Sequence, residues 1–209
     1  MKKRVLWFFF TLFSVLIGLY PAIYFLFEMK QGLLSSKSLE LLNSQLWTTA
    51  FYGHIAFGGV ALLSGFSQFS YRIRNRHLKI HKILGRIYVI TVLLSGISAL
   101  YIAIYATGGI ISQMGFGMLA ILWLLSTNKA FIHIRNGLVD LHKIWMIRSF
   151  ALTFAAVMLR VWLPLMQIGL SIDFFLAYKI VAWLCWVPNL IVAELIIKSL
   201  LIRKDPVFS

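Results

Sequence analysis

The stretch IRNRHLKIHKI at residues 73–83 returns later in the chain as IRNGLVDLHKI at residues 134–144. Six of the eleven positions are identical, two more stay apolar, and every match keeps the same offset of 61 residues. Self-similarity at a constant offset is typical of an internal repeat, in which one structural unit occurs twice. Each copy lies between two long apolar runs. The repeated unit is therefore predicted to be a helix, a basic segment and a second helix.

We expect the two units to span about residues 46–107 and about residues 108–168. Two units in the same orientation imply a pseudo-twofold axis along the membrane normal, as in membrane proteins with parallel repeats. This axis would make His81 and His142 counterparts that lie at equal depth and face a common axis. The pairing of these two histidines is the strongest functional signal in the sequence.

The apolar runs predict an integral membrane protein. Hydrophobic residues make up 61% of the chain and charged residues only 12%, which exceeds what a soluble domain of this size buries. Runs of about 18 or more apolar residues indicate membrane-spanning helices. Six runs qualify, at about residues 5–27, 46–69, 83–107, 113–131, 144–168 and 174–197. The sequence therefore predicts a single all-α membrane domain, with spans two to five as the core bundle and spans one and six as peripheral helices.

The formal net charge of +14 is explained by topology. If the N-terminus is cytoplasmic, 16 of the 20 Lys and Arg residues fall on cytoplasmic segments, and the outer loops keep only Lys30, Lys37 and Lys179. The positive-inside rule then predicts a protein of the cytoplasmic (inner) membrane with both termini in the cytoplasm. Contact with anionic lipid accounts for the basic segments better than binding of nucleic acid.

Two ionisable residues, His54 and Arg160, lie well inside the apolar runs, away from the run ends, and each has a functional and a structural interpretation. His54 shares one helical face with small residues, and Arg160 is expected at a similar depth in the outer leaflet. Ionisable residues inside a membrane are costly, so they mark candidate functional sites. His54 and Arg160 could flank a polar ligand such as a quinone head group. Alternatively, His54 bonds to a neighbouring helix, and Arg160 bonds to carbonyls of a broken helix or extends toward the surface.

The matched histidines have the properties of haem ligands. Inward-facing histidines on a four-helix bundle hold b-type haem in membranes, with two neutral imidazoles as axial ligands. His81 and His142 begin matched helices and could supply both ligands. Gly85 lies one turn beyond His81 and leaves room beside the imidazole, while Arg86 and Arg148 could pair with the propionates.

Other functions use the same residues. The inner histidines could bind a transition metal ion with His77 or His133 as a third ligand, in a non-catalytic metal-binding or assembly factor. The chain could also be a small transporter with Arg160 and His54 in its path, or could bind no cofactor at all. The sequence contains no paired carboxylates, nucleophile elbow or HExxH motif that would indicate a hydrolase.

The residues resemble a family of bacterial predicted membrane proteins, domain of unknown function 2306, over about residues 53–164. The resemblance lies in His54-x3-Gly58, Ala61-Leu62, Gly65 with Gln68-Phe69, His81-Lys82-x2-Gly85-Arg86-x-Tyr88 and His142-Lys143-x-Trp145-Met146-x-Arg148-Ser149. That family has no known activity, so this resemblance implies a fold but no function.

The core also resembles the four-helix di-haem membrane cytochromes, which pair histidines on core helices two and four and on helices three and five. His81 and His142 match the second pair, whereas His54 and His133 lie at unequal depths and leave the first pair incomplete. The resemblance therefore implies one haem b. It favours a membrane oxidoreductase component that transfers electrons to or from quinone.

Overall fold

The chain folds into long helices. The computed structural model describes residues 2–26 and 32–204; it is 87% helical and contains no strand within those ranges. The helices, in order, are α1 (Lys2–Leu19), α2 (Pro21–Leu26), α3 (Leu39–Asn43), α4 (Gln45–Ser67), α5 (Tyr71–Arg76), α6 (Leu78–Ala103), α7 (Ile110–Arg135), α8 (Val139–Thr153), α9 (Ala155–Pro164), α10 (Phe174–Leu184) and α11 (Val187–Lys204). A 3₁₀ turn (Gly32–Ser36) precedes α3, and a π-helical turn (Leu165–Gly169) follows α9.

Six of these helical segments are long and apolar enough to cross a membrane, as predicted. They run over Arg4–Tyr24, Gln45–Ser67, Leu78–Ala103, Ile110–Arg135, Val139–Gly169 and Phe174–Ile202. The third and fifth segments begin five residues earlier than the sequence predicted, and the fourth ends four residues later. The predicted end of span one at Phe27 and the outer-loop residue Lys30 lie outside the described residues.

Most of the repeated basic stretch is helical, whereas the sequence predicted a basic segment that connects two helices. In the first copy, α5 ends at Arg76 and α6 begins at Leu78; in the second, α7 continues to Arg135 and α8 begins at Val139. A helix is held by backbone hydrogen bonds between residues four apart, so it can continue beyond the apolar run. The charged side chains of the added turns then reach the water at the membrane surface. As a result, His81 and His142 each occupy the fourth position of a long helix.

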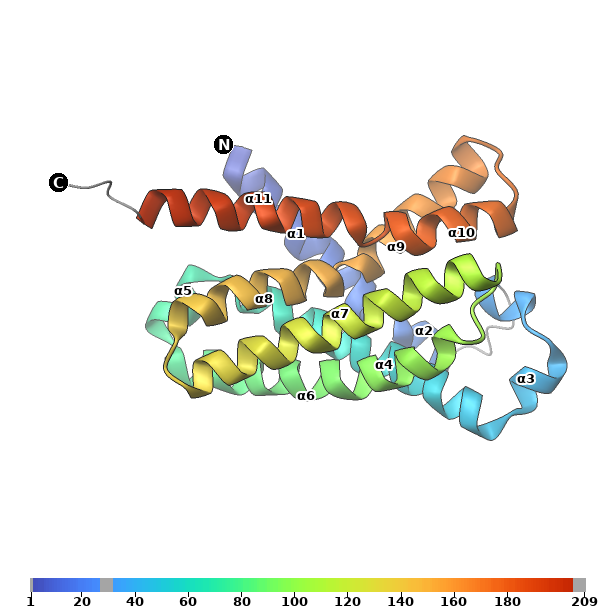
Figure 1. Cartoon of the computed structure of the whole chain (residues 1–209), viewed down its shortest axis with the longest axis horizontal. Helices are drawn as coiled ribbons and strands as arrows, with labels where there is room; N and C mark the ends of the chain where they lie inside the picture. The colour runs from blue at the N-terminus through green and yellow to red at the C-terminus, as the bar shows by residue number, and fades with distance from the viewer. Residues whose placement is uncertain (1, 27–31, 205–209) are drawn as a thin grey trace.

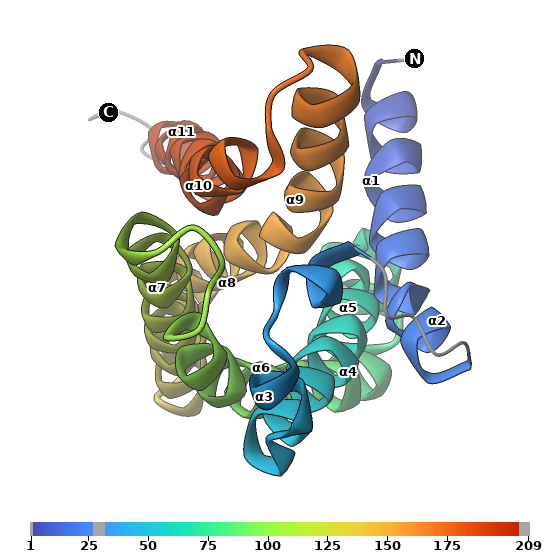
Figure 2. The same ribbon diagram turned by 90° about the vertical axis from the view of Figure 1, so that its right-hand side faces the viewer.

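Helices α4, α6, α7 and α8 form the core bundle (Figure 1). α4 packs along α6, α6 along α7 and α7 along α8, so α6 and α8 occupy diagonal corners of the bundle (Figure 2). We call the end at which α6 and α8 begin the basic end and the opposite end the far end. α1 packs on α4, and α11 packs on α8. The first and last described residues both lie toward the basic end (Figure 1).

Spans five and six are each broken near their middle. At the α8–α9 junction, the Thr153 hydroxyl donates to the carbonyl of Ser149 (3.0 Å), an interaction that bends helices, and α9 leaves the line of α8 (Figure 2). At the α10–α11 junction, Pro188 cannot donate a backbone hydrogen bond. The side-chain amide of Asn189 instead donates to the carbonyls of Cys185 (3.0 Å) and Ala151 (3.1 Å), which joins α11 to α8.

A cluster of hydrogen-bonded side chains fills the middle of the bundle. The Tyr88 hydroxyl lies 2.6 Å from the Ser149 hydroxyl and 2.7 Å from that of Thr153. Trp123 donates to Thr153 (2.9 Å), and Thr127 lies 2.6 Å from Ser149. These buried groups satisfy one another, which an apolar membrane interior requires. Tyr88 and Ser149 are 61 positions apart, the offset of the sequence repeat, so a repeat axis would pass between them.

Candidate functional site

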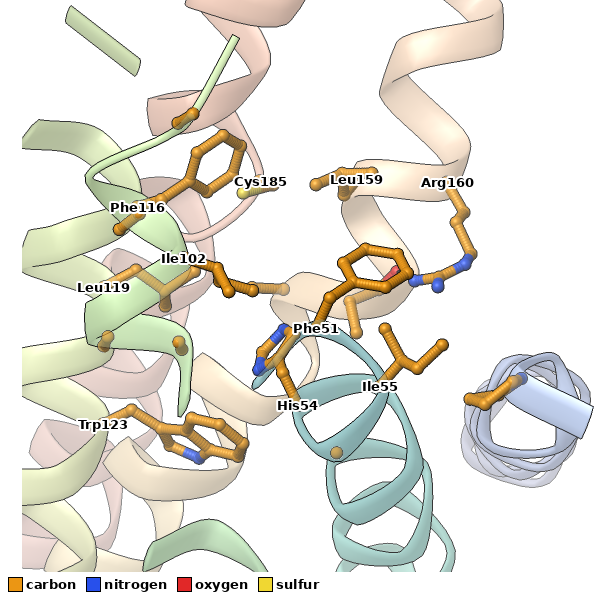
Figure 3. A pocket seen from close by; sticks show the side chains of 18 of the residues that line it. Phe51, His54, Ile55, Ile102, Phe116, Leu119, Trp123, Leu159, Arg160 and Cys185 are labelled. Atoms are coloured by element: carbon orange, nitrogen blue, oxygen red, sulfur yellow. The ribbon is translucent and has the colours of Figure 1, made fainter. Parts of the chain in front are cut away.

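A cavity of about 260 Å³ lies at the far end of the bundle, between α4, α6, α7 and α9 (Figure 3). We call it the far-end cavity. Residues on both sides of the α8–α9 break line it, so it lies beside the break in span five. Its walls are mostly apolar and aromatic, and Phe51, Phe116 and Trp123 are among them. His54 and Arg160 both line it, so the structure brings together the two residues that the sequence predicted for a quinone site.

The contacts of His54 indicate which ring nitrogen donates. Nδ1 lies 3.1 Å from the carbonyl oxygen of Ser95 and 3.0 Å from the Ser95 hydroxyl, which itself donates to the carbonyl of His54 (2.8 Å). Both oxygens can accept from Nδ1, so we infer that Nδ1 donates, and Nε2 is then the acceptor whenever the ring is neutral. The ring extends toward the space between Phe51 and Trp123 (Figure 3). His54 therefore offers an acceptor to a molecule in the far-end cavity.

The guanidinium of Arg160 bonds to a backbone carbonyl of its own helix, which is one of the two structural interpretations, and it also lines the far-end cavity. Nη1 donates to the carbonyl of Ala156 (2.9 Å), and the guanidinium lies 4.6 Å from the centre of the Tyr20 ring. These contacts hold the planar group in place, because an aromatic face attracts a cation. Among the described residues this is its single hydrogen bond, and a guanidinium has five N–H groups. Arg160 can therefore still donate to a ligand.

Lys37 also lines the far-end cavity, and sequence reasoning did not select it. Its ammonium donates to the carbonyl of Tyr105 in the α6–α7 connection, and the neighbouring Ser36 hydroxyl lies 2.9 Å from that of Thr107. These two contacts hold the segment before α3 across the far end. The only sequence signal was that Lys37 is one of three cations in the outer loops, which does not indicate that it faces a cavity.

A larger groove of about 1800 Å³ lies at the basic end, and we call it the basic-end groove. Residues of α6, α8 and α11 line it, together with the first turns of α1 and the basic ends of α4 and α7. His81 and His142 both contribute to its wall, and so do Gly85 and Arg86. Four of the five residues predicted for a haem site therefore share one groove.

The two histidines of this groove differ in their hydrogen bonds. Nδ1 of His142 lies 2.9 Å from the carbonyl of Ala130, so it carries the proton and leaves Nε2 free to bind a metal. Nδ1 of His81 is buried and has no hydrogen-bond partner among the described residues. Gly85 packs beside Gln68, whose Oε1 would lie 3.3 Å from an added Cβ atom.

Arg148 does not line the groove, in contrast to its predicted role beside a propionate. It forms a bidentate ion pair with Glu194 of α11, with Nε 2.6 Å from Oε1 and Nη2 2.9 Å from Oε2. Its guanidinium also lies over the ring of Trp145, at 4.5 Å. The carboxylate comes from a helix far away in sequence, and it turns Arg148 away from the histidines.

The remaining predicted ligands lie outside the groove. His77 is exposed at the end of α5, and His133 is partly buried in the last turn of α7. Among the described residues, no group of three or more His, Cys, Asp or Glu side chains lies close enough together to hold a metal ion. Neither histidine therefore joins His81 and His142 as a third ligand in this arrangement.

The family model of predicted membrane proteins named DUF2306 matches residues 51–197. The chain belongs to the DUF2306 family. No curated protein and no solved structure matches it. The DUF2306 region begins within α4 and ends within α11, so it contains His54, His81, His142 and Arg160. Lys37 lies before it.

Proposed function

We propose that the protein is a membrane oxidoreductase component that holds a b-type haem between His81 and His142 and exchanges electrons with a quinone. The observation that carries this proposal is that both repeat-matched histidines line the basic-end groove from diagonal helices. With Nδ1 of His142 donating to the carbonyl of Ala130, its Nε2 would be free to hold the haem iron. When bound, a b-type haem supplies one-electron transfer.

The groove can accommodate a macrocycle of this kind. Its volume of about 1800 Å³ exceeds the roughly 300–1,000 Å³ of most small-molecule sites, and its wall is mainly apolar. Gly85 lies one turn from His81 in the groove wall, where it adds no side chain of its own beside Gln68. Arg86 and Lys82 follow His81 on α6, are exposed, and carry positive charge suited to propionates. Nδ1 of His81 is buried, so Nε2 is the nitrogen of this ring that would bind the iron.

The quinone would occupy the far-end cavity. His54 Nε2 accepts a hydrogen bond from a hydroquinone hydroxyl, and the guanidinium of Arg160 donates to a quinone carbonyl. Aromatic walls suit the ring, as in most small-molecule sites with a few polar groups. The orientation in the inner membrane follows from charge. Exposed cations such as Arg74 and Lys143 gather at the basic end, so this end would face the cytoplasm and its anionic lipid.

Absorption spectra test the haem assignment. The protein is purified after expression with haem supplied, and spectra are recorded oxidised and reduced. We expect a Soret band and visible bands that sharpen on reduction. His81→Ala and His142→Ala should each lose the bands, since each leaves one axial ligand. His77→Ala is the matched control and should keep the spectrum, because His77 is exposed outside the groove.

Two outcomes would contradict the assignment. One is wild-type protein without haem bands when haem is supplied, and the other is full haem retention in both variants. The quinone assignment is tested separately with His54→Ala. This variant should keep its haem bands but lose reduction of the haem by a soluble quinol. Unchanged reduction by quinol would remove His54 from the site.

A further inference from the structure

The charged groups of the far-end cavity all have the same sign. Lys37 and Arg160 are the charged residues among those that line it, and no Asp or Glu contributes to its described wall. His54 adds no negative charge, because an imidazole ring is either neutral or cationic. The cavity therefore places two cations in mainly apolar surroundings, where the attraction between opposite charges is much stronger than in water.

Within residues 2–26 and 32–204, neither cation forms an ion pair, and each is held in position by uncharged groups. The Arg160 guanidinium bonds to the carbonyl of Ala156 and stacks on Tyr20, and the Lys37 ammonium bonds to the carbonyl of Tyr105. Carbonyl groups and a ring orient a cation but carry no formal negative charge. A bound anion would supply that charge to both groups at once.

We propose that the far-end cavity binds a ring head group in its anionic form more tightly than the same ring in its neutral form. This inference rests on the quinone assignment above, and it names the class of quinone. That class carries an ionised hydroxyl group on the ring. Burial of such an anion is costly unless cations and donors meet it, and Arg160 and Lys37 provide both. In the reduced form of such a ring, the hydroquinone hydroxyl would donate to the His54 acceptor and orient the ring.

A matched pair of ligands tests this charge preference. At pH 7, 2-hydroxy-1,4-naphthoquinone is ionised, whereas 2-methoxy-1,4-naphthoquinone has a similar shape and is neutral. Binding of each to the purified protein is followed by quenching of tryptophan fluorescence, since Trp47 and Trp123 line the cavity. We expect the hydroxy compound to bind with a Kd at least about tenfold lower, as for other anions beside unbalanced cations.

Variants identify the groups responsible for this preference. Lys37→Gln and Arg160→Gln should each reduce the preference, measured as the Kd of the methoxy compound divided by that of the hydroxy compound, several-fold. The main cause would be weaker binding of the hydroxy compound. Lys179→Gln is the control, because Lys179 lies near Gly108 at the same end but does not line the cavity. It should leave the ratio unchanged. Lys37→Gln remains informative if Arg160→Gln fails to fold, since Lys37 lies in a segment between helices.

The outcomes separate this inference from the proposed function. Equal affinity for the two compounds would overturn the charge preference and leave a quinone site in place. Absence of binding by either compound would overturn the preference together with the quinone assignment. A preference that survives in both Lys37→Gln and Arg160→Gln would show that other groups recognise the anion, which also overturns the inference.

Discussion

Lys37 carries a titratable amine in a partly buried position between helices. Burial lowers the pKa of this amine from 10.5 to about 8, because desolvation penalises the charged form. Between these two pH values the unfolded chain binds more protons than the folded chain. The free energy of unfolding should therefore rise with pH across this window. The other titratable side chains that line the same cavity are Tyr24, His54, Arg160, Tyr178 and Cys185.

A comparison of wild type with Lys37→Gln tests this linkage. Wild-type protein should gain about 1 kcal/mol over the variant between pH 8 and pH 10.5, a figure reduced for the solvent that still reaches the ammonium. Unfolding in detergent is measured at several pH values for both proteins. Groups that titrate in the same way in wild type and in Lys37→Gln contribute equally to both free energies of unfolding, so they do not affect the difference. A difference that stays constant with pH would mean that folding leaves the pKa of Lys37 unchanged.

At the scale of helices, Gly65 allows α4 to approach α6 and α8 closely. A Cβ atom at this position would lie 2.6 Å from Cε2 of Phe150 and 2.7 Å from Cε2 of Tyr88. Neither ring can easily move, because Tyr88 is bonded to Ser149 and Thr153 and Phe150 is buried. Small residues are common where membrane helices pack closely, and this contact gives the reason here.

Gly65→Ala should therefore destabilise the bundle, by about 1–3 kcal/mol, as for overpacked cores. Gly117→Ala is the matched control, since Gly117 lies within α7 and an added Cβ would meet nothing within 4 Å. The control should be neutral or slightly more stable, because Ala favours helix over Gly. Thermal unfolding in detergent, followed by circular dichroism, compares the two variants. Equal stability of both variants would show that α4 can shift to accept the methyl group.

The long helices could be predicted from sequence, but their interruptions could not. Hydropathy identifies six spans because the bilayer requires long apolar runs. It does not identify the break after Thr153, which depends on a hydroxyl bonded to the carbonyl one turn earlier. Pro188 was visible in the sequence, yet its effect depends on Asn189 bonding to Ala151 of another helix.

The candidate sites were predictable in part, for a similar reason. His54 and Arg160 could be identified because ionisable residues are rare inside apolar runs, and His81 and His142 because they repeat. The direction of Arg148 depends on Glu194, a partner that only the packing of α11 supplies. The same applies to Lys37, which reaches the cavity only through its contact with the α6–α7 connection.

At the scale of the whole molecule, the two hollows lie at opposite ends of one bundle. Between them lies the hydroxyl cluster around Tyr88, and two of its members, Trp123 and Thr153, also line the far-end cavity. In the proposed function, haem and quinone would therefore occupy different leaflets. Electrons would pass along the bundle, and the orientation of the chain decides which side of the membrane each site faces.

The orientation prediction rests on the gathering of cations at the basic end, which should keep that end in the cytoplasm. Reporter proteins fused after Lys82 and after Lys143 should both give cytoplasmic signals, because these residues lie in the first turns of α6 and α8. A fusion after Ser36, which lies before α3 at the far end, should give an external signal. Alkaline phosphatase is active only outside the cytoplasm and green fluorescent protein fluoresces inside it, so the two reporters check each other. A cytoplasmic signal after Ser36, together with external signals after Lys82 and Lys143, would reverse the orientation. The groove of His81 and His142 would then face the outside, and contact with the anionic cytoplasmic leaflet would no longer explain its basic residues.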